Sequence, residues 1–189
     1  GGRTGALSES MKPEGRLTNY AKGKIKVAKF GFQCAKELDK VFIHVRPFYV
    51  FGPDQRPGSL INDVFYSFKK GATPELGPCE QFRDYIYVND VAEGILRAMD
   101  INESTTLNLG SGRYIEVKEF VAKFWDCLGG DRSKLKFGSR PIRSGEPEQP
   151  RSFANLIHLK NSMGWFPDRS LEDGIKLTIK KLDEMPPLK

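Results

Sequence analysis

A short and almost uninterrupted apolar segment, Val41-Phe42-Ile43-His44-Val45, constrains the fold more than any other feature of this sequence. A strand with one solvent-exposed face alternates apolar and polar residues, whereas a strand buried on both faces is a continuous apolar run. Sheets covered on both faces are usually parallel, with helices on each side. A helical pattern over 20–38 precedes the segment, so the order of elements favours an α/β fold with a parallel sheet.

The helical pattern begins after a polar, turn-rich opening, where the Thr18-Asn19 pair is expected to cap the helix. Mostly small and apolar residues share one stripe of this helix, and lysines line the opposite side. The chain has a formal net charge of +6, but a solvated helix face explains this lysine cluster better than a nucleic-acid patch does. The residues of the stripe are Tyr20, Lys24, Val27, Ala28, Gly31, Ala35 and Leu38.

Helices and strands alternate along the rest of the chain. We expect Asn89-Asp90 to cap a helix that ends near Met99, and Gly110-Ser111-Gly112 to follow a strand. The segment 138–150, rich in Gly, Pro, Arg and Glu, is expected to be an ordered loop or a flexible linker. The other predicted elements are strands at 83–88 and 106–109 and helices at 60–70, 117–128, 156–163 and 171–182.

Composition excludes several classes of protein. The three cysteines form no C-x-x-C pair and the two histidines lie far apart, so neither a disulfide framework nor a metal site is expected. No apolar run approaches the ~20 residues of a membrane span, and the first residues lack the apolar core of a signal peptide. We therefore expect a soluble, cytoplasmic protein with no membrane contact.

One tyrosine–lysine pair is a candidate for proton transfer. A tyrosine, with a pKa of about 10, exchanges protons near neutral pH only if a neighbouring ammonium favours its phenolate form. Tyr20 and Lys24 are one helical turn apart, but the same spacing recurs at 66–70 and 114–118, at the end and at the start of predicted helices. Only the pair at Tyr20 heads a helix that leads into the buried strand, and this context favours it.

Several segments, in order along almost the whole chain, resemble motifs of the extended short-chain dehydrogenase/reductases, in their NAD-dependent epimerase/dehydratase branch acting on nucleotide sugars. Tyr20-Ala-Lys-Gly-Lys24 is similar to the catalytic Tyr-x-x-x-Lys of that family. The others are Arg46 through Gly52-Pro53, Arg83-Asp-Tyr-Ile-Tyr-Val-Asn-Asp-Val-Ala-Glu93, Leu107-Asn-Leu-Gly-Ser-Gly112, Arg143-Ser-Gly-Glu146, Gly164-Trp165 and Ser170-Leu171-Glu172-Asp173-Gly174.

The resemblance implies roles for individual residues. Tyr20 would exchange a proton with the sugar, while Lys24 would lower the tyrosine pKa and hold the ribose of NAD or NADP. Arg83 and Arg143 would clamp the nucleotide diphosphate, because a guanidinium donates two parallel hydrogen bonds to phosphate. Asn62, at the start of the 60–70 helix, is a further candidate for the nucleotide.

This sequence departs from the family pattern at two places that bear on the site. Tyr49 stands where the family usually has an asparagine that helps to hold the substrate, so we include it among the substrate-binding residues. The glycine-rich loop that presents backbone amides to the pyrophosphate of the cofactor is absent from this chain. The resemblance therefore implies the C-terminal portion of a Rossmann-type parallel sheet plus a smaller α/β substrate-binding lobe.

The resemblance also implies a domain division and a function. Residues 1–53 would be the remnant of the dinucleotide-binding half and 54–189 mainly the nucleotide-sugar lobe, with 90–110 packing back on the sheet. The predicted function is a nucleotide-sugar epimerase, dehydratase or 4-keto reductase, inactive as an isolated chain and homodimeric through the 20–38 helix. The alternative is a non-catalytic nucleotide-sugar-binding module; a nucleic-acid binder, favoured only by the net charge, ranks third.

Overall fold

The computed structural model describes residues 4–13, 17–141 and 151–185 of the 189-residue chain. Its helices and strands alternate, as the sequence predicts. The helices are α1 (Asn19–Glu37), α2 (Leu60–Lys69), α3 (Val88–Ala98), α4 (Val117–Cys127), α5 (Ile157–Met163) and α6 (Leu171–Glu184), with a 3₁₀ turn at Arg132–Lys134. The strands are β1 (Gly5–Leu7), β2 (Ile43–Pro47), β3 (Tyr49–Phe51), β4 (Phe82–Arg83), β5 (Tyr85–Tyr87), β6 (Thr105–Leu109), β7 (Ile115–Glu116) and β8 (Ser152–Ala154).

The strands pair two by two, and three of the four pairs are parallel. β2 pairs with β6, β3 with β5 and β1 with β8 in parallel, whereas β4 and β7 are antiparallel. The predicted parallel α/β arrangement is confirmed. The predicted strand at 83–88 is wrong in one respect, because Asp84 separates β4 from β5 and Val88 already belongs to α3. The prediction missed β1 in the turn-rich opening.

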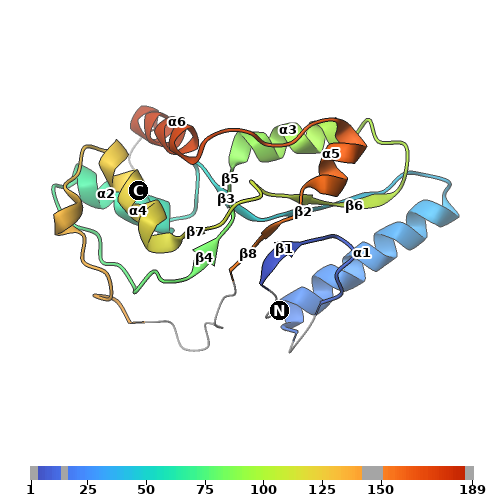
Figure 1. The fold of residues 1–189 in the computed structure, drawn as a ribbon, viewed down its shortest axis with the longest axis horizontal. Coiled ribbons are helices and arrows are strands. Elements are labelled where there is room, and N and C mark those ends of the chain that lie inside the picture. The colour runs from blue at the N-terminus through green and yellow to red at the C-terminus, as the bar shows by residue number, and fades with distance from the viewer. Residues whose placement is uncertain (1–3, 14–16, 142–150, 186–189) are drawn as a thin grey trace.

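Helices lie on both sides of the β2–β6 pair (Figure 1). α3 and α5 contact one face, and α1 approaches β2 on the other side through Gly31, which lies against the ring of Phe42. A Cβ added at Gly31 would lie 2.3 Å from the Cζ atom of Phe42, so only glycine fits at this crossing. The cover is incomplete, because the residues of the run 42–45 are only half-buried and Val41 is 48% exposed, so the prediction of a strand buried on both faces is wrong.

The predicted stripe of α1 is only partly buried. Thr18 caps the helix as predicted, accepting a hydrogen bond from the amide of Ala21 at 3.2 Å. Ala28 and Ala35 are buried, but the larger apolar residues of the helix are not. Val27, Phe30 and Leu38 are 64%, 67% and 68% exposed. The helix therefore buries small residues and leaves larger apolar side chains exposed.

Two clusters of buried side chains form the core. One, around the β2–β6 pair, α3 and α5, contains Ile86, Leu107, Leu109 and Leu159. The other joins α2, α4 and α6 beside β3 and β5, and its largest fully buried side chains include Phe65, Phe120 and Phe124. Within the described ranges, no helix is both long enough and apolar enough to cross a membrane.

The predicted cap of α3 is wrong. The helix begins at Val88, and its N-cap, Tyr87, makes no side-chain capping bond. Asp90 instead accepts hydrogen bonds from Nε of Arg169 at 2.9 and 3.1 Å. Because Asp90 is buried, this pairing with the segment before α6 outweighs a local cap.

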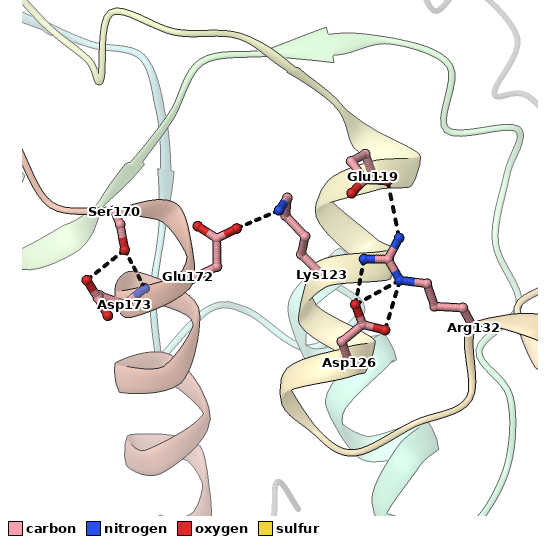
Figure 2. A network of polar contacts seen from close by, with 7 residues as sticks. All are labelled: Glu119, Lys123, Asp126, Arg132, Ser170, Glu172 and Asp173. Atoms are coloured by element: carbon pink, nitrogen blue, oxygen red, sulfur yellow. Dashed lines mark hydrogen bonds and ion pairs between the residues drawn. The ribbon is translucent and has the colours of Figure 1, made fainter.

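Polar contacts also tie α4 to its neighbours (Figure 2). Lys123 pairs with Glu172 at the start of α6, while Arg132 holds both carboxylate oxygens of Asp126 through Nε at 2.8 Å. Ser170 caps α6 by accepting from the amide of Asp173. The paired groups are partly exposed, so each pair contributes little stability and the contacts chiefly fix the orientation of the helices.

Candidate functional site

A cleft of about 450 Å³ opens where strands β1, β2 and β6 end. Ligands of parallel α/β sheets bind at the carboxyl ends of the strands, and this is such a place. The residues that line it are Leu7, Ser8, Met11, Lys12, Pro13, Arg46, Pro47, Phe48, Tyr49, Asn108 and Ser152.

A second, smaller cavity of about 250 Å³ shares no lining residue with the cleft. It lies beside Tyr87 and the start of α6, and its buried acid, Asp90, is already paired with Arg169. Because that pair satisfies both charges, we place the candidate site in the larger cleft.

Tyr49 stands at the edge of the cleft and stacks on Arg83. The Cζ atom of Arg83 lies 4.4 Å from the centre of the Tyr49 ring, a cation–π contact. Parallel pairing of β3 with β5 and the hydrogen bond from the Tyr49 amide to the carbonyl of Asp84 fix this approach. Arg83 is 6% exposed and is absent from the described lining of the cleft. Of these two side chains, only Tyr49 lines the cleft.

Asp84, next to Arg83, joins three segments of the chain. Its carboxylate accepts hydrogen bonds from the amide and hydroxyl of Ser111 at 2.7 Å, from the Gly112 amide at 3.2 Å and from the Ala154 amide at 2.9 Å. Burial raises the pKa of this carboxyl, while the hydrogen bonds oppose the shift. The group fixes the glycine turn after β6 and strand β8 to the start of β5.

Tyr20 and Lys24 lie together on the first turns of α1. Nζ of Lys24 is 5.5 Å from the centre of the Tyr20 ring, and Tyr20 is 75% exposed. Neither residue is among those that line the cleft. Burial lowers the pKa of His44 on β2, and the charges of Arg46 and Lys24 lower it further. The charges of Lys24 on α1 and of Arg46 in the cleft thus both affect the His44 imidazole.

Asn62 is buried in the first turn of α2. Its Nδ2 donates to the carbonyls of Gln55 at 2.7 Å and Arg56 at 3.2 Å, while its Oδ1 has no hydrogen-bond partner. These bonds hold the loop that precedes α2. Arg143 lies outside the described residues.

The structure thus brings the predicted residues together as two pairs, Tyr20 with Lys24 and Tyr49 with Arg83. The sequence analysis did not single out Lys12, and it assigned no role to Asn108 in the cleft or to Asp84, although both stand in motifs that it quoted. Arg46 was recognised as part of a motif, but no role was assigned to it. Lys12 carried no signal, because it stands in a turn-rich segment without periodicity.

Comparison with known proteins gives the same family. Residues 2–110 match the model of the NAD dependent epimerase/dehydratase family. A UDP-glucuronate 4-epimerase from Thermodesulfobacterium geofontis is 24% identical over 182 residues, which are 94% of this chain and 54% of that protein. A CDP-abequose synthase from Salmonella typhimurium is 28% identical over 158 residues, 80% of this chain and 52% of that protein. The chain therefore spans about half the length of these curated relatives.

Solved structures support the Rossmann-type fold. The crystal structure of a UDP-glucose 4-epimerase from Thermotoga maritima, with UDP-glucose, has a TM-score of 0.77 and 26% identity. The match covers 89% of this chain and 54% of that one. Other solved neighbours are complexes with NAD or with NADPH.

Proposed function

Because this chain belongs to the NAD-dependent epimerase/dehydratase family, we propose that the whole protein is a nucleotide-sugar epimerase, dehydratase or 4-keto reductase. The observation that carries the proposal is the cleft at the carboxyl ends of β1, β2 and β6, with the Tyr49–Arg83 stack at its edge. Nucleotide sugars carry a diphosphate, and guanidinium groups bind phosphate well. Arg83 and Arg143 are the proposed diphosphate ligands, and Asn62, which holds the loop before α2, is a further proposed contact of the nucleotide.

In the proposed reaction, Tyr20 exchanges a proton with a hydroxyl or carbonyl of the sugar. Its exposed phenol is open to a ligand, and the ammonium of Lys24 lies 5.5 Å from the centre of the ring. NAD, when bound, supplies the hydride acceptor. Residues 1–53 would form part of the cofactor-binding half and 54–189 mainly the nucleotide-sugar lobe, with 90–110 returning to the sheet.

The described residues fit only part of NAD. Tyr20 and Lys24 suit the nicotinamide end, but the pyrophosphate needs free backbone amides at a turn between a strand and a helix. The glycine turn after β6 leads into strand β7 and not into a helix, and the amides of Ser111 and Gly112 already bond to Asp84. Because the chain spans about half the length of its curated relatives, we infer that a part of the whole protein that this chain lacks completes the cofactor site, and that the chain alone is inactive.

Calorimetry tests these roles. With UDP-glucose as the probe, we expect the chain to bind the nucleotide sugar and Arg83→Met to weaken binding about ten-fold or more, as for a charge-assisted bond. Failure to bind UDP-glucose or any other sugar nucleotide would refute the function. In the alternative, a non-catalytic binding module, the whole protein also binds the sugar nucleotide but gives no turnover with NAD.

A homodimer through α1 is the proposed assembly. Val27, Phe30 and Leu38 form an exposed apolar face on this helix, and such a face favours association. We do not assign a role to nucleic acid, because the lysines of α1 are exposed singly along a solvated face.

A further inference from the structure

We propose that the smaller cavity, beside Tyr87 and the start of α6, is a second binding site, and that its ligand is a small aromatic carboxylate held by Arg113 and Tyr87. The cavity shares no lining residue with the cleft that is proposed to bind the nucleotide sugar. Binding in the cavity therefore does not depend on the proposed function.

The walls of the cavity are mainly aromatic and aliphatic. They include Phe51, Tyr85, Tyr87, Tyr114, Ile115 and Leu171. The volume of about 250 Å³ lies just below the about 300–1,000 Å³ of sites for drug-sized ligands. The space therefore suits a ligand built on a single ring.

Contacts between rings hold these walls in place. The ring centre of Phe51 lies 6.1 Å from that of Tyr85 and 5.7 Å from that of Tyr87. Tyr85 in turn stacks on the buried ring of Phe120, with the centres 4.0 Å apart. A wall that is already fixed by packing loses little conformational freedom when a ligand binds, and this favours binding.

The charged groups of the cavity leave one cation over. Its two acids are each paired, because Nε of Arg169 donates to Asp90 at 2.9 Å and Lys123 pairs with Glu172 (Figure 2). The side chain of Arg113, in contrast, makes no ion pair or hydrogen bond with any residue that the structure describes. A ligand with one negative charge would balance this guanidinium.

Tyr87 adds a hydrogen-bond donor. The residue is 4% exposed, and within the described ranges nothing hydrogen-bonds to its hydroxyl. Burial raises the pKa of this phenol, so the hydroxyl keeps its proton at neutral pH and can donate it to a carboxylate. Ser170 and Leu171, where α6 begins, also line the cavity, and the positive end of the helix dipole favours an anion there.

An aromatic carboxylate satisfies both the walls and the cation. Its ring would pack against the aromatic side chains, and its carboxylate would accept the parallel hydrogen bonds of the Arg113 guanidinium. A small inorganic anion would satisfy the charge but leave the apolar walls in contact with water. A neutral aromatic ligand would cover the walls but leave the charge unbalanced.

Calorimetry with benzoate, benzamide and acetate tests the proposed site. We expect benzoate to bind about ten-fold or more tightly than the neutral benzamide, as for a charge-assisted hydrogen bond. Benzoate should also bind about ten-fold or more tightly than acetate, which has no ring to bury. Arg113→Gln should reduce the affinity for benzoate to that for benzamide, and Tyr87→Phe should weaken benzoate about three-fold or more. The control Arg46→Gln removes a guanidinium of the cleft and should leave the affinity for benzoate unchanged.

Other results would overturn the proposed site. Equal affinity for benzoate and benzamide would mean that the cavity recognises no charge, and equal affinity for benzoate and acetate would exclude an aromatic ligand. If Arg46→Gln weakens benzoate and Arg113→Gln does not, benzoate binds in the cleft. If benzoate does not bind to the folded wild-type protein, there is no such site. Arg113 is exposed, so its substitution should not disturb the fold, and melting temperatures establish that each variant is folded.

Discussion

The crossing of α1 over β2 makes a quantitative prediction, because α1 contains two glycines in opposite surroundings. A Cβ added at Gly23 would meet no atom within 4 Å, whereas one added at Gly31 would lie 2.3 to 2.8 Å from three atoms of the Phe42 ring. Replacing a helical glycine by alanine gains about 1 kcal/mol when nothing opposes it. We therefore expect Gly23→Ala to stabilise the protein by about that amount.

At Gly31 the same gain is opposed by overlap with the Phe42 ring. Phe42 packs edge-on against Phe32, with ring centres 5.1 Å apart, so the ring must displace its neighbours or α1 must move away. Overpacking of this kind costs about 1–3 kcal/mol. Gly31→Ala should thus be neutral to destabilising by about 2 kcal/mol, after its helical gain of about 1 kcal/mol is subtracted.

Urea or thermal unfolding of the two variants measures the difference. A change of 1 kcal/mol moves the midpoint of a protein of this size by about 2–4 °C, so Gly23→Ala should melt above the wild type and Gly31→Ala at or below it. Adding Phe42→Leu should lessen the effect of Gly31→Ala by removing the ring. If Gly31→Ala stabilises as much as Gly23→Ala, the contact between α1 and β2 is not as the structure has it.

Three other predictions concern the site and the assembly. Tyr49→Leu removes the ring that stacks on Arg83 and should weaken UDP binding about three-fold or more, as expected for a cation–π contact. Tyr49→Phe keeps a ring and should keep the affinity for UDP in calorimetry. Equal effects of the two substitutions would contradict the stacking role. The lowered pKa of His44 means that the unfolded chain takes up a proton before the folded one as pH falls below about 6.5, so stability is lost on acidification in that window. Urea titrations at pH 7.5 and 5.5 should show this loss reduced in His44→Gln, and an undiminished loss would rule out His44 as its source. Phe30→Glu on the exposed apolar face of α1 should shift a dimer toward monomer in light scattering, whereas the control Lys29→Glu should not. An unchanged molecular mass of the Phe30→Glu variant would exclude this face from the dimer interface.

The sequence predicted those features that depend on local periodicity. The apolar run at 41–45 predicted a strand, and β2 begins within it at Ile43, although its residues are half-buried or exposed rather than buried on both faces. Thr18, expected to cap the first helix, accepts a hydrogen bond from the Ala21 amide at 3.2 Å. These predictions succeeded because each depends on residues close together in the chain.

The features that the sequence did not predict depend on distant partners. β1 has only three residues and exists because it pairs with β8, far along the chain, so no local pattern marks it. From the sequence alone, Asp90 resembles a helix cap, because nothing near it in the chain indicates its pairing with Arg169. Lys12 enters the cleft only because Asn108 holds the segment after β1 against β6.

The junction at Asp84 has a consequence for how the molecule opens. One buried carboxylate shields the amides of Ser111, Gly112 and Ala154, which belong to segments widely separated in the chain. If one of these segments opened alone, the buried carboxylate of Asp84 would lose hydrogen bonds without gaining contact with water. The segments are therefore expected to open in a single cooperative event. The amides of Ala154 in β8 and of Ser111 and Gly112 after β6 would then exchange with solvent deuterium at one rate. Any ligand that slows the exchange of one of these amides would slow that of the others.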